Sequence, residues 1–292
     1  MAVNVGIELL FDGSPGNSIT DAPGIAKALE DMGFNSLWLP DHVVVFEQYA
    51  PNYSYSPDGQ PPFGPRQGWF DPLYGLAMMA TSTSRVRLGT NALILPQRQP
   101  ALLAKEIVAL DHLSGGRIDL GVGLGWSPEE FAAMGVPWER RGARADEYIE
   151  AMTRLWQDEV ATYQGEFVSF EGAVSLPKPV QSPRPPVIIG GQSKGALRRA
   201  ARLGDGWSSW MLMPDQMPDV LAQLDKECEA AGRDPGSLRK IHTTFYAGAS
   251  EFEQYLKMAE SQGMDEVIVV PWVPDRDPFE VLQEIAKIAG QI

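Results

Sequence analysis

The sequence predicts an α/β fold, and within that class a (β/α)8 barrel, the TIM barrel, with insertion loops. Short apolar runs rich in β-branched residues recur along the chain, and segments with helical periodicity separate most of them. This alternation is typical of a parallel sheet covered by helices. About eight such runs in 292 residues favour a closed barrel. The pattern alone leaves a doubly wound sheet as the alternative.

The expected strands are continuous apolar runs, because a parallel strand in such a fold is buried on both faces. They are Val3–Leu10, Ser36–Leu39, Val86–Leu95, Ile118–Val122, Val187–Ile189, Trp207–Met211, Ile241–Phe245 and Val267–Val270.

The clearest expected helix is Pro100–Leu113, because proline suits a first helical turn and leucines recur there at helical spacing. Gly115 and Gly116 then end it. The other expected helices are Asp21–Met32, Ala143–Gln157, Lys194–Leu203, Gln216–Ala231, Glu251–Ser261 and Pro278–Ile288.

Two stretches interrupt the alternation. Gln48–Trp69 is rich in Pro, Gly, Tyr and Ser, and a long irregular segment in a compact domain is usually functional or disordered. We expect a lid or pocket wall there, with a floppy surface insertion as the alternative. Val160–Pro186 contains a predicted hairpin turn at Tyr163–Phe167 and several prolines. Neither stretch has a core of its own, so we expect a single domain over residues 1–292 with insertions at about 45–70 and 159–186.

Composition excludes several classes of function. A formal net charge of −14 argues against nucleic acid and anionic membranes as partners. The single cysteine, Cys228, excludes an internal disulfide, and three scattered histidines form no recognisable zinc pattern, so we expect no metal. No basic leader and no apolar run of about 20 residues is present, and we expect a cytoplasmic protein.

Polar residues follow the second expected strand directly, in the run Leu37-Trp38-Leu39-Pro40-Asp41-His42. Ligands gather where the carboxyl ends of parallel strands open to solvent. The imidazole of His42 titrates near neutrality and can give or take a proton, although a histidine in a loop can also be purely structural. Asp41 could bond a ligand N–H or cap the turn.

A second junction follows the fifth strand, where Gly190, Gly191, Gln192 and Ser193 lead into a helix. A helix N-terminus after glycines can bind a phosphate, while a simple turn explains the glycines equally well. Gly121–Gly125 resembles a dinucleotide fingerprint only superficially, and close approach of backbones is the better interpretation. Trp207 and Trp210 flank the end of the sixth strand, and one of them is a candidate wall of a flat-ligand pocket.

Together these segments resemble the bacterial-luciferase-like superfamily, and within it the oxidoreductases that use the deazaflavin coenzyme F420. The matching pieces cover about residues 1 to 211. They are Trp38–His42, Arg85–Thr90, Leu113–Arg117, Gly121–Trp126, Pro177–Gln181, Ile189–Gly191 and Ala200–Trp207.

The resemblance implies a luciferase-like barrel with a tricyclic cofactor at the carboxyl ends of its strands. By this resemblance Asp41 and His42 lie beside the deazaflavin ring, and the Gly190-Gly191 turn holds the cofactor phosphate. A non-prolyl cis peptide is expected between Asn91 and Ala92. The implied cofactor-binding residues are Asp41, Asn91, Ala92, Gly123, Leu124, Gly190, Gly191, Gln192 and Ser193.

The chain also departs from that family's pattern. Phe46 stands where related enzymes with sugar or alcohol substrates carry a tryptophan, and Trp126 stands where they carry a glutamate. The loss of that carboxylate argues against a sugar or alcohol dehydrogenase reaction. We expect Phe46, Trp126 and Trp207 to shape the substrate pocket.

Three functions follow from the resemblance. The first is an F420-dependent oxidoreductase in which a hydride moves between the deazaflavin and a small organic substrate, with His42 as the catalytic residue that handles the proton. The second is an FMN-dependent monooxygenase that uses reduced flavin and oxygen. The third is a barrel that binds a cofactor without turnover. Barrels of this family commonly form homodimers.

Overall fold

The structure is a computed structural model that describes residues 3–290, so residues 1, 2, 291 and 292 of the expected domain lie outside the described part. Its main sheet is parallel and has the strand order β3-β2-β1-β11-β10-β9-β8-β5-β4, with a further pairing of β3 with β5 that closes the barrel. The short strand β4 continues the position of β3, so the barrel has the eight positions of a (β/α)8 fold. The barrel strands are β1 (Asn4–Glu8), β2 (Ser36–Leu39), β3 (Arg87–Thr90), β4 (Leu93–Ile94), β5 (Ile118–Gly123), β8 (Val187–Gly190), β9 (Gly206–Trp210), β10 (Arg239–Phe245) and β11 (Glu266–Val270).

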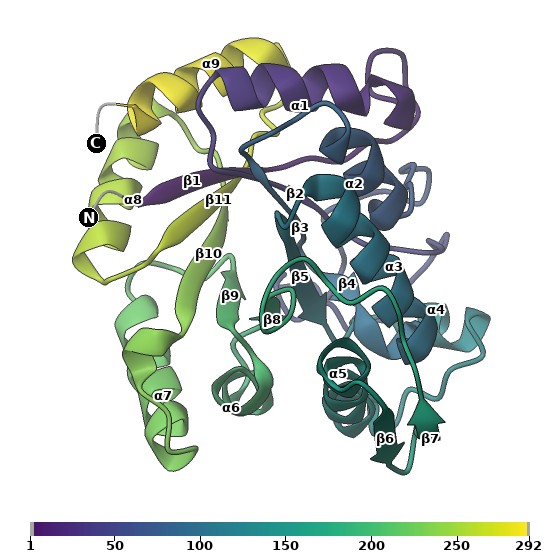
Figure 1. The fold of residues 1–292 in the computed structure, drawn as a ribbon. Helices are drawn as coiled ribbons and strands as arrows, with labels where there is room; N and C mark the ends of the chain where they lie inside the picture. Colours follow the sequence, from purple (N-terminus) through teal and green to yellow (C-terminus); the bar gives the residue numbers. More distant parts are fainter. Residues whose placement is uncertain (1–2, 291–292) are drawn as a thin grey trace.

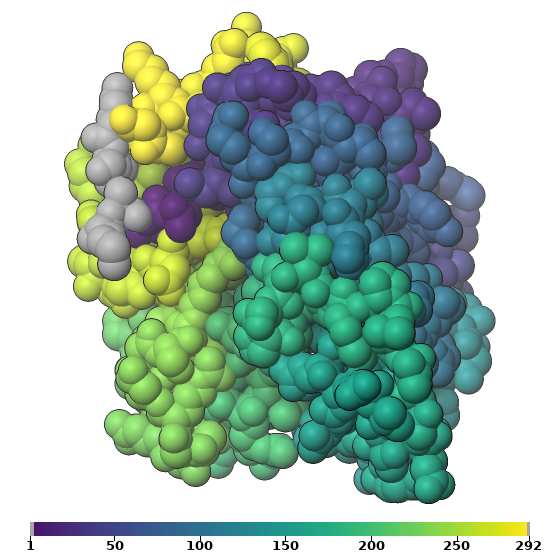
Figure 2. Space-filling view, viewed as in Figure 1, coloured from purple at the N-terminus to yellow at the C-terminus, as the bar shows by residue number. Residues whose placement is uncertain are grey.

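Helices surround this barrel in chain order (Figure 1). They are α1 (Ala22–Asp31), α2 (Pro72–Ala80), α3 (Pro100–Ser114), α4 (Pro128–Ala133), α5 (Arg141–Gln157), α6 (Lys194–Leu203), α7 (Met217–Ala230), α8 (Ala249–Ser261) and α9 (Pro278–Ala289). In the space-filling view the sequence colours follow one another around the molecule, from purple through teal and green to yellow (Figure 2). This circular order places the first and last strands side by side, and β1 pairs with β11.

Most expected elements agree with the structure within a few residues, and the barrel is confirmed. The expected strand Val86–Leu95 is divided into β3 and β4, because the chain bends at a cis peptide between Asn91 and Ala92. The helices α2 and α4 were not predicted. The sequence of α2 is apolar almost throughout, which hides the helical period, and α4 has only six residues.

The inside of the barrel has its own small apolar layer, separate from the large core between sheet and helices. It consists of Trp38, Ile188, Ile241 and Ile268, all buried. The indole of Trp38 fits because β3 carries Gly89 opposite it, where a Cβ would lie only 2.3 Å from the ring. This layer divides the barrel interior into two ends. The end at the amino termini of the strands, called the lower end here, is charged. The end at the carboxyl termini, called the upper end, is polar.

The lower end is closed by ion pairs that join neighbouring strands and also reach across the barrel from β10 to β5. The buried Asp119 accepts hydrogen bonds from Arg87 at 2.6 Å and from Arg239 at 2.8 Å. Arg239 also donates to the buried Glu266 at 2.5 Å. In TIM barrels this amino-terminal face of the sheet contributes to stability, whereas ligands bind at the other end.

Both insertions are ordered elements of the fold. The predicted hairpin forms between β6 (Ala161–Gln164) and β7 (Ser169–Ala173), which pair antiparallel. The segment 48–69 lies at the carboxyl end of the barrel, where its Tyr53 hydroxyl accepts a hydrogen bond from the indole of Trp210 at 3.1 Å. Of the helices that the structure describes, none has the length and apolar character needed to cross a bilayer.

Candidate active site at the carboxyl end of the barrel

Three groups that are far apart in sequence meet at the carboxyl ends of parallel strands. His42 follows β2, the cis peptide Asn91-Ala92 joins β3 to β4, and Gly190-Gly191 ends β8. The methyl group of Ala92 lies next to two glycines: a Cβ on Gly123 would be 3.4 Å from it, and one on Gly190 would be 3.5 Å from it. These small residues, the patch at Ala92, lie together at the carboxyl ends of β3, β5 and β8, on the same rim of the barrel as His42.

His42 is held by a buried carboxylate on α4. Its Nδ1 lies 3.1 Å from Oε2 of Glu130, and Oε1 of Glu130 accepts a hydrogen bond from the backbone amide of Val43 at 2.7 Å. The side chain of Glu130 is 1% exposed and that of His42 is 10% exposed. A carboxylate on Nδ1 favours the tautomer with the proton on that atom. Nε2 then remains for a ligand.

Aromatic side chains surround the imidazole on several sides. The ring centroid of His42 lies 5.1 Å from that of Phe63, 4.8 Å from that of Trp69 and 5.9 Å from that of Trp126. Phe63 and Trp69 belong to the 48–69 segment, so this segment forms a wall of the site. Such packing excludes water from the neighbourhood of His42.

Asp41 anchors the chain next to the site, and each of its carboxylate oxygens accepts a hydrogen bond within the described chain. Its Oδ2 accepts a hydrogen bond from the amide of Ile94 in β4 at 2.9 Å, and its Oδ1 accepts one from Arg98 at 2.8 Å. Burial raises the pKa of Asp41, and the Arg98 guanidinium opposes this shift. The sequence left open a bond to a ligand N–H or a cap of the turn, and in the structure Asp41 joins the loop after β2 to β4 and Arg98.

A polar layer forms the floor of the site inside the barrel. The amide nitrogen Nδ2 of Asn91 donates to Glu8 at 2.6 Å and to the hydroxyl of Thr243 at 2.9 Å. The hydroxyl of Ser208 lies 3.4 Å from the Asn91 Oδ1. Burial raises the pKa of Glu8 to about 8, while the hydrogen bond from Asn91 opposes this shift.

The Gly-Gly turn leads into α6 as expected, with Ser193 as its N-cap: the Ser193 hydroxyl accepts from the amide of Ala196 at 3.2 Å. Gly191 has a φ of 107°, which favours glycine. Its amide already donates to the Ser208 carbonyl at 2.9 Å. The amides open to an anion are therefore those at the start of α6, in the first turn, where no intrahelical acceptor exists.

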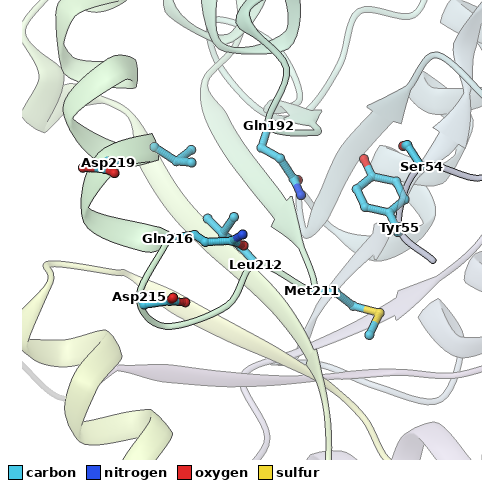
Figure 3. A pocket seen from close by; sticks show the side chains of 9 residues that line it. Ser54, Tyr55, Gln192, Met211, Leu212, Asp215, Gln216 and Asp219 are labelled. Atoms are coloured by element: carbon cyan, nitrogen blue, oxygen red, sulfur yellow. The ribbon is translucent and has the colours of Figure 1, made fainter. Parts of the chain in front are cut away.

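A pocket of about 590 Å³ opens beside this turn. Figure 3 shows Ser54 and Tyr55 on one side of it, Asp215 and Asp219 on the other, and Gln192 between them. The Gln192 carboxamide donates to the Trp210 carbonyl at 3.2 Å, which joins the ends of β8 and β9. The pocket therefore connects the turn after β8 with the 48–69 segment.

The residues expected to shape the substrate pocket lie in three different places. Trp126 contacts His42 and Tyr53, with a ring distance of 5.2 Å to the latter. Phe46 packs on Tyr49 at 5.9 Å, one step further from the imidazole. Trp207 is fully buried in the main core, and its indole donates to the Gly191 carbonyl at 2.7 Å.

Trp207 therefore supports the turn from behind, and Trp210 is the tryptophan of this pair that meets the pocket wall at Tyr53. Leu124 is half-buried and packs against the main core. A Cβ on Gly142 at the start of α5 would lie 3.7 Å from it. Its side chain thus points away from the patch at Ala92.

Sequence reasoning missed two acidic residues of the site. Glu130 lies in the run Ser127-Pro128-Glu129-Glu130, which is typical of a helix N-terminus and could have revealed α4. Glu8 is a charged residue within an apolar strand, which signals either a strand end or a buried functional group. Neither signal indicates which partner the carboxylate contacts.

Comparison with known proteins agrees with this architecture. Residues 3–270 match the family model described as luciferase-like monooxygenase. The chain belongs to this family. An uncharacterized protein of Mycobacterium tuberculosis is 34% identical over 261 residues, which cover 88% of both chains. The FMNH(2)-dependent dimethylsulfone monooxygenase of Pseudomonas putida is 33% identical over 172 residues, which cover 58% of this chain and 46% of that protein.

Solved structures of luciferase-like proteins share the fold at low sequence identity. An F420-dependent secondary alcohol dehydrogenase, in complex with an F420-acetone adduct, has a TM-score of 0.81 at 16% identity and covers 99% of this chain and 98% of its own. The long-chain alkane monooxygenase LadA has a TM-score of 0.81 at 14% identity, with 100% and 92% coverage. Proteins similar to this chain thus include an F420-dependent dehydrogenase, which shares the fold, and an FMNH(2)-dependent monooxygenase, and the family match makes this chain a luciferase-like oxidoreductase or monooxygenase.

Proposed function

We propose that this protein is an F420-dependent oxidoreductase that moves a hydride between the deazaflavin and a small organic substrate. The observation that carries the proposal is the position of His42: one imidazole nitrogen is held by the buried Glu130, and His42 follows β2 on the same rim of the barrel as the small residues Ala92, Gly123 and Gly190. A flat ring needs such a patch, because any larger side chain there would occupy its place.

The residues present fit a flavin or deazaflavin ring with a phosphate-bearing tail. The patch at Ala92 would take the ring, and the first turn of α6 after Gly190-Gly191 would take the phosphate. Between them Gln192 and Ser193 connect the ends of β8, β9 and α6. Asn91 would lie beneath the ring and Asp41 would hold the neighbouring chain.

The deazaflavin supplies a ring carbon that accepts or releases a hydride. His42 handles the proton: when the substrate loses a hydride, Nε2 takes the proton that the substrate releases, and in the opposite direction it returns that proton. Glu130 stabilises the imidazolium formed by this transfer. The aromatic wall from Phe63, Trp69 and Trp126 keeps water out and shapes the substrate space, with Phe46 at its outer edge.

The test is the variant His42→Ala, with His112→Ala as the matched control. His112 hydrogen-bonds the Lys178 carbonyl on the outside of the barrel and has no contact with the site. Hydride transfer should fall about 10²-fold or more in His42→Ala while coenzyme binding is retained. Unchanged turnover in this variant would remove the assigned role, and loss of turnover in both variants would point to a general structural effect.

An FMN-dependent monooxygenase is the second candidate, and a specific observation favours it. The Pseudomonas putida relative that is 33% identical over 172 residues is described as FMNH(2)-dependent. Mass and absorption spectra of the cofactor that co-purifies from a host that makes F420 would separate the two, followed by binding titrations with both. Tight binding of FMN with none of F420 would reverse the order of the candidates.

A further inference from the structure

The floor of the site contains a carboxyl group that the assignment of the proton to His42 leaves unused. Glu8 is the last residue of β1 and is 8% exposed. Its Oε2 accepts the hydrogen bond from Asn91 Nδ2 at 2.6 Å. Over residues 3–290 no cation forms an ion pair with it, and Oε1 has no hydrogen-bond partner.

Among residues 3–290, the groups placed against Glu8 are neutral. Asn91 follows β3 directly, and through it Glu8 is linked to Thr243 of β10 and Ser208 of β9. From the 48–69 segment comes Tyr53, whose pKa burial raises to about 12, with Glu8 among the smaller causes. Below lies the apolar layer of Trp38 and Ile268, which separates Glu8 from the charged lower end.

These surroundings keep the carboxyl group neutral under ordinary conditions. Desolvation disfavours the ionised form, and no cation compensates. A neutral carboxyl group has one O–H donor together with acceptor oxygens. Because Oε2 already accepts from Asn91, the proton is best placed on Oε1, and this donor lacks an acceptor within the described chain.

We propose that Glu8 is a hydrogen-bond donor of the coenzyme site, so that binding of the coenzyme is coupled to protonation of this residue. This inference rests on the proposed function, since it requires a flavin or deazaflavin ring on the floor. Both ring systems carry carbonyl and nitrogen acceptors that a neutral Oε1–H can meet. An ionised Glu8 would offer only acceptors to these atoms and would repel them.

The first experiment compares coenzyme affinity in wild type and Glu8→Gln, using F420 and FMN separately, from about pH 6 to about pH 9. Glutamine keeps a donor at this position and does not titrate. The ratio of the two affinities should be flat at the acidic end and should fall for wild type up to about tenfold per pH unit above about pH 8. Titration of the coenzyme itself cancels in this ratio.

The exposed Glu229 in α7 gives the matched control, because Glu229→Gln makes the same chemical change far from the floor and should follow wild type at every pH. A wild-type to Glu8→Gln ratio that stays constant with pH overturns the proposal.

The second measurement needs no ligand. Infrared difference spectra of the wild-type protein between neutral and alkaline pH should show a protonated-carboxyl C=O band that disappears as Glu8 ionises, and Glu8→Gln should lack it. Absence of the band at neutral pH overturns the proposal. If the band is present but neither coenzyme binds, the proposed function has failed; if a coenzyme binds with a constant ratio, only the role of Glu8 has failed.

Discussion

The two ends of the barrel interior differ in the partners that they give to buried acidic side chains. At the lower end the buried carboxylates Asp119 and Glu266 are each paired with an arginine that remains partly exposed. At the upper end Glu8 is also buried, and its hydrogen-bond partner among the described residues is the amide of Asn91, which also bonds the hydroxyl of Thr243. The same parallel sheet forms both ends. The difference therefore lies in what each end is built to contact.

This comparison indicates that buried carboxylates are paired with arginines where the barrel is closed. A carboxyl group without an ion-pair partner, Glu8, lies where a ligand can supply its missing hydrogen bond. Breaking a buried ion pair leaves an unpaired charge at a cost of several kcal/mol. A neutral carboxyl group carries no such charge, so it can stay buried without a partner until a ligand binds. Four predictions follow from this comparison.

The largest effect is expected from Asp119→Ala at the lower end. The change leaves Arg87 and Arg239 facing each other without their shared carboxylate, and the free energy of unfolding should fall by about 3 kcal/mol. Denaturant unfolding measures it. Asp225→Ala, which breaks the half-exposed pair with Lys240, is the control and should cost about 1 kcal/mol or less. Equal losses in the two variants would contradict the closing role of the lower network.

At the upper end, Glu8 should make the stability depend on pH. Its pKa is raised from 4.5 in the unfolded chain to about 8 in the fold, so between these values the native state binds a proton that the unfolded state lacks. Stability contributed by this group is therefore fully present below about pH 4.5 and is lost as pH rises towards about 8, by at most about 1.4 kcal/mol per pH unit.

The measurement is the free energy of unfolding of wild type and Glu8→Gln at several pH values. Their difference isolates Glu8 from every other titrating group, because the variant keeps the shape and loses only the titration. A difference that is the same at pH 5 and pH 8 would show that Glu8 titrates normally in the fold.

A smaller effect is expected from substitution of Glu130, the acidic residue that holds His42 at the upper end. Glu130→Gln should lower kcat about tenfold with little change in KM or coenzyme affinity, because the imidazolium of His42 loses its charged partner only while it carries the proton. Glu129→Gln is the matched control, since the adjacent carboxylate holds the amide of Ala50 and does not reach His42. An equal loss in both variants would assign Glu130 to the packing of α4 alone.

The smallest effect concerns the wall formed by the 48–69 segment. Tyr53→Phe removes the hydrogen bond to Trp210 and leaves the ring contacts with Trp126 and Tyr55 in place. Coenzyme release should become about threefold to tenfold faster, which corresponds to one ordinary hydrogen bond. Stopped-flow displacement measures this rate, with the exposed Tyr74→Phe as control. An unchanged rate would show that Tyr53 does not hold the segment closed.

Much of the frame of the site follows from local sequence. Ser36–Leu39 and Lys194–Leu203 have the bounds that the pattern predicts, because apolar runs, N-caps and glycines act within a few residues. The same local signals place His42 and Gly190-Gly191 after their strands. Since parallel strands of one barrel end on one rim, these groups were expected to converge, and they do.

What each side chain contacts was decided by the tertiary structure. Glu130 is 88 residues from His42, and Asn91 is 83 residues from Glu8. Asp41 and His42 are neighbours, yet one bonds β4 and Arg98 while the other faces the aromatic wall. Sequence patterns therefore determined which residues stand at the rim, because hydrophobic period and turn chemistry are local. Only the closed barrel decided which acid is paired and which is left neutral, because burial and long-range contacts arise from the packing of distant strands.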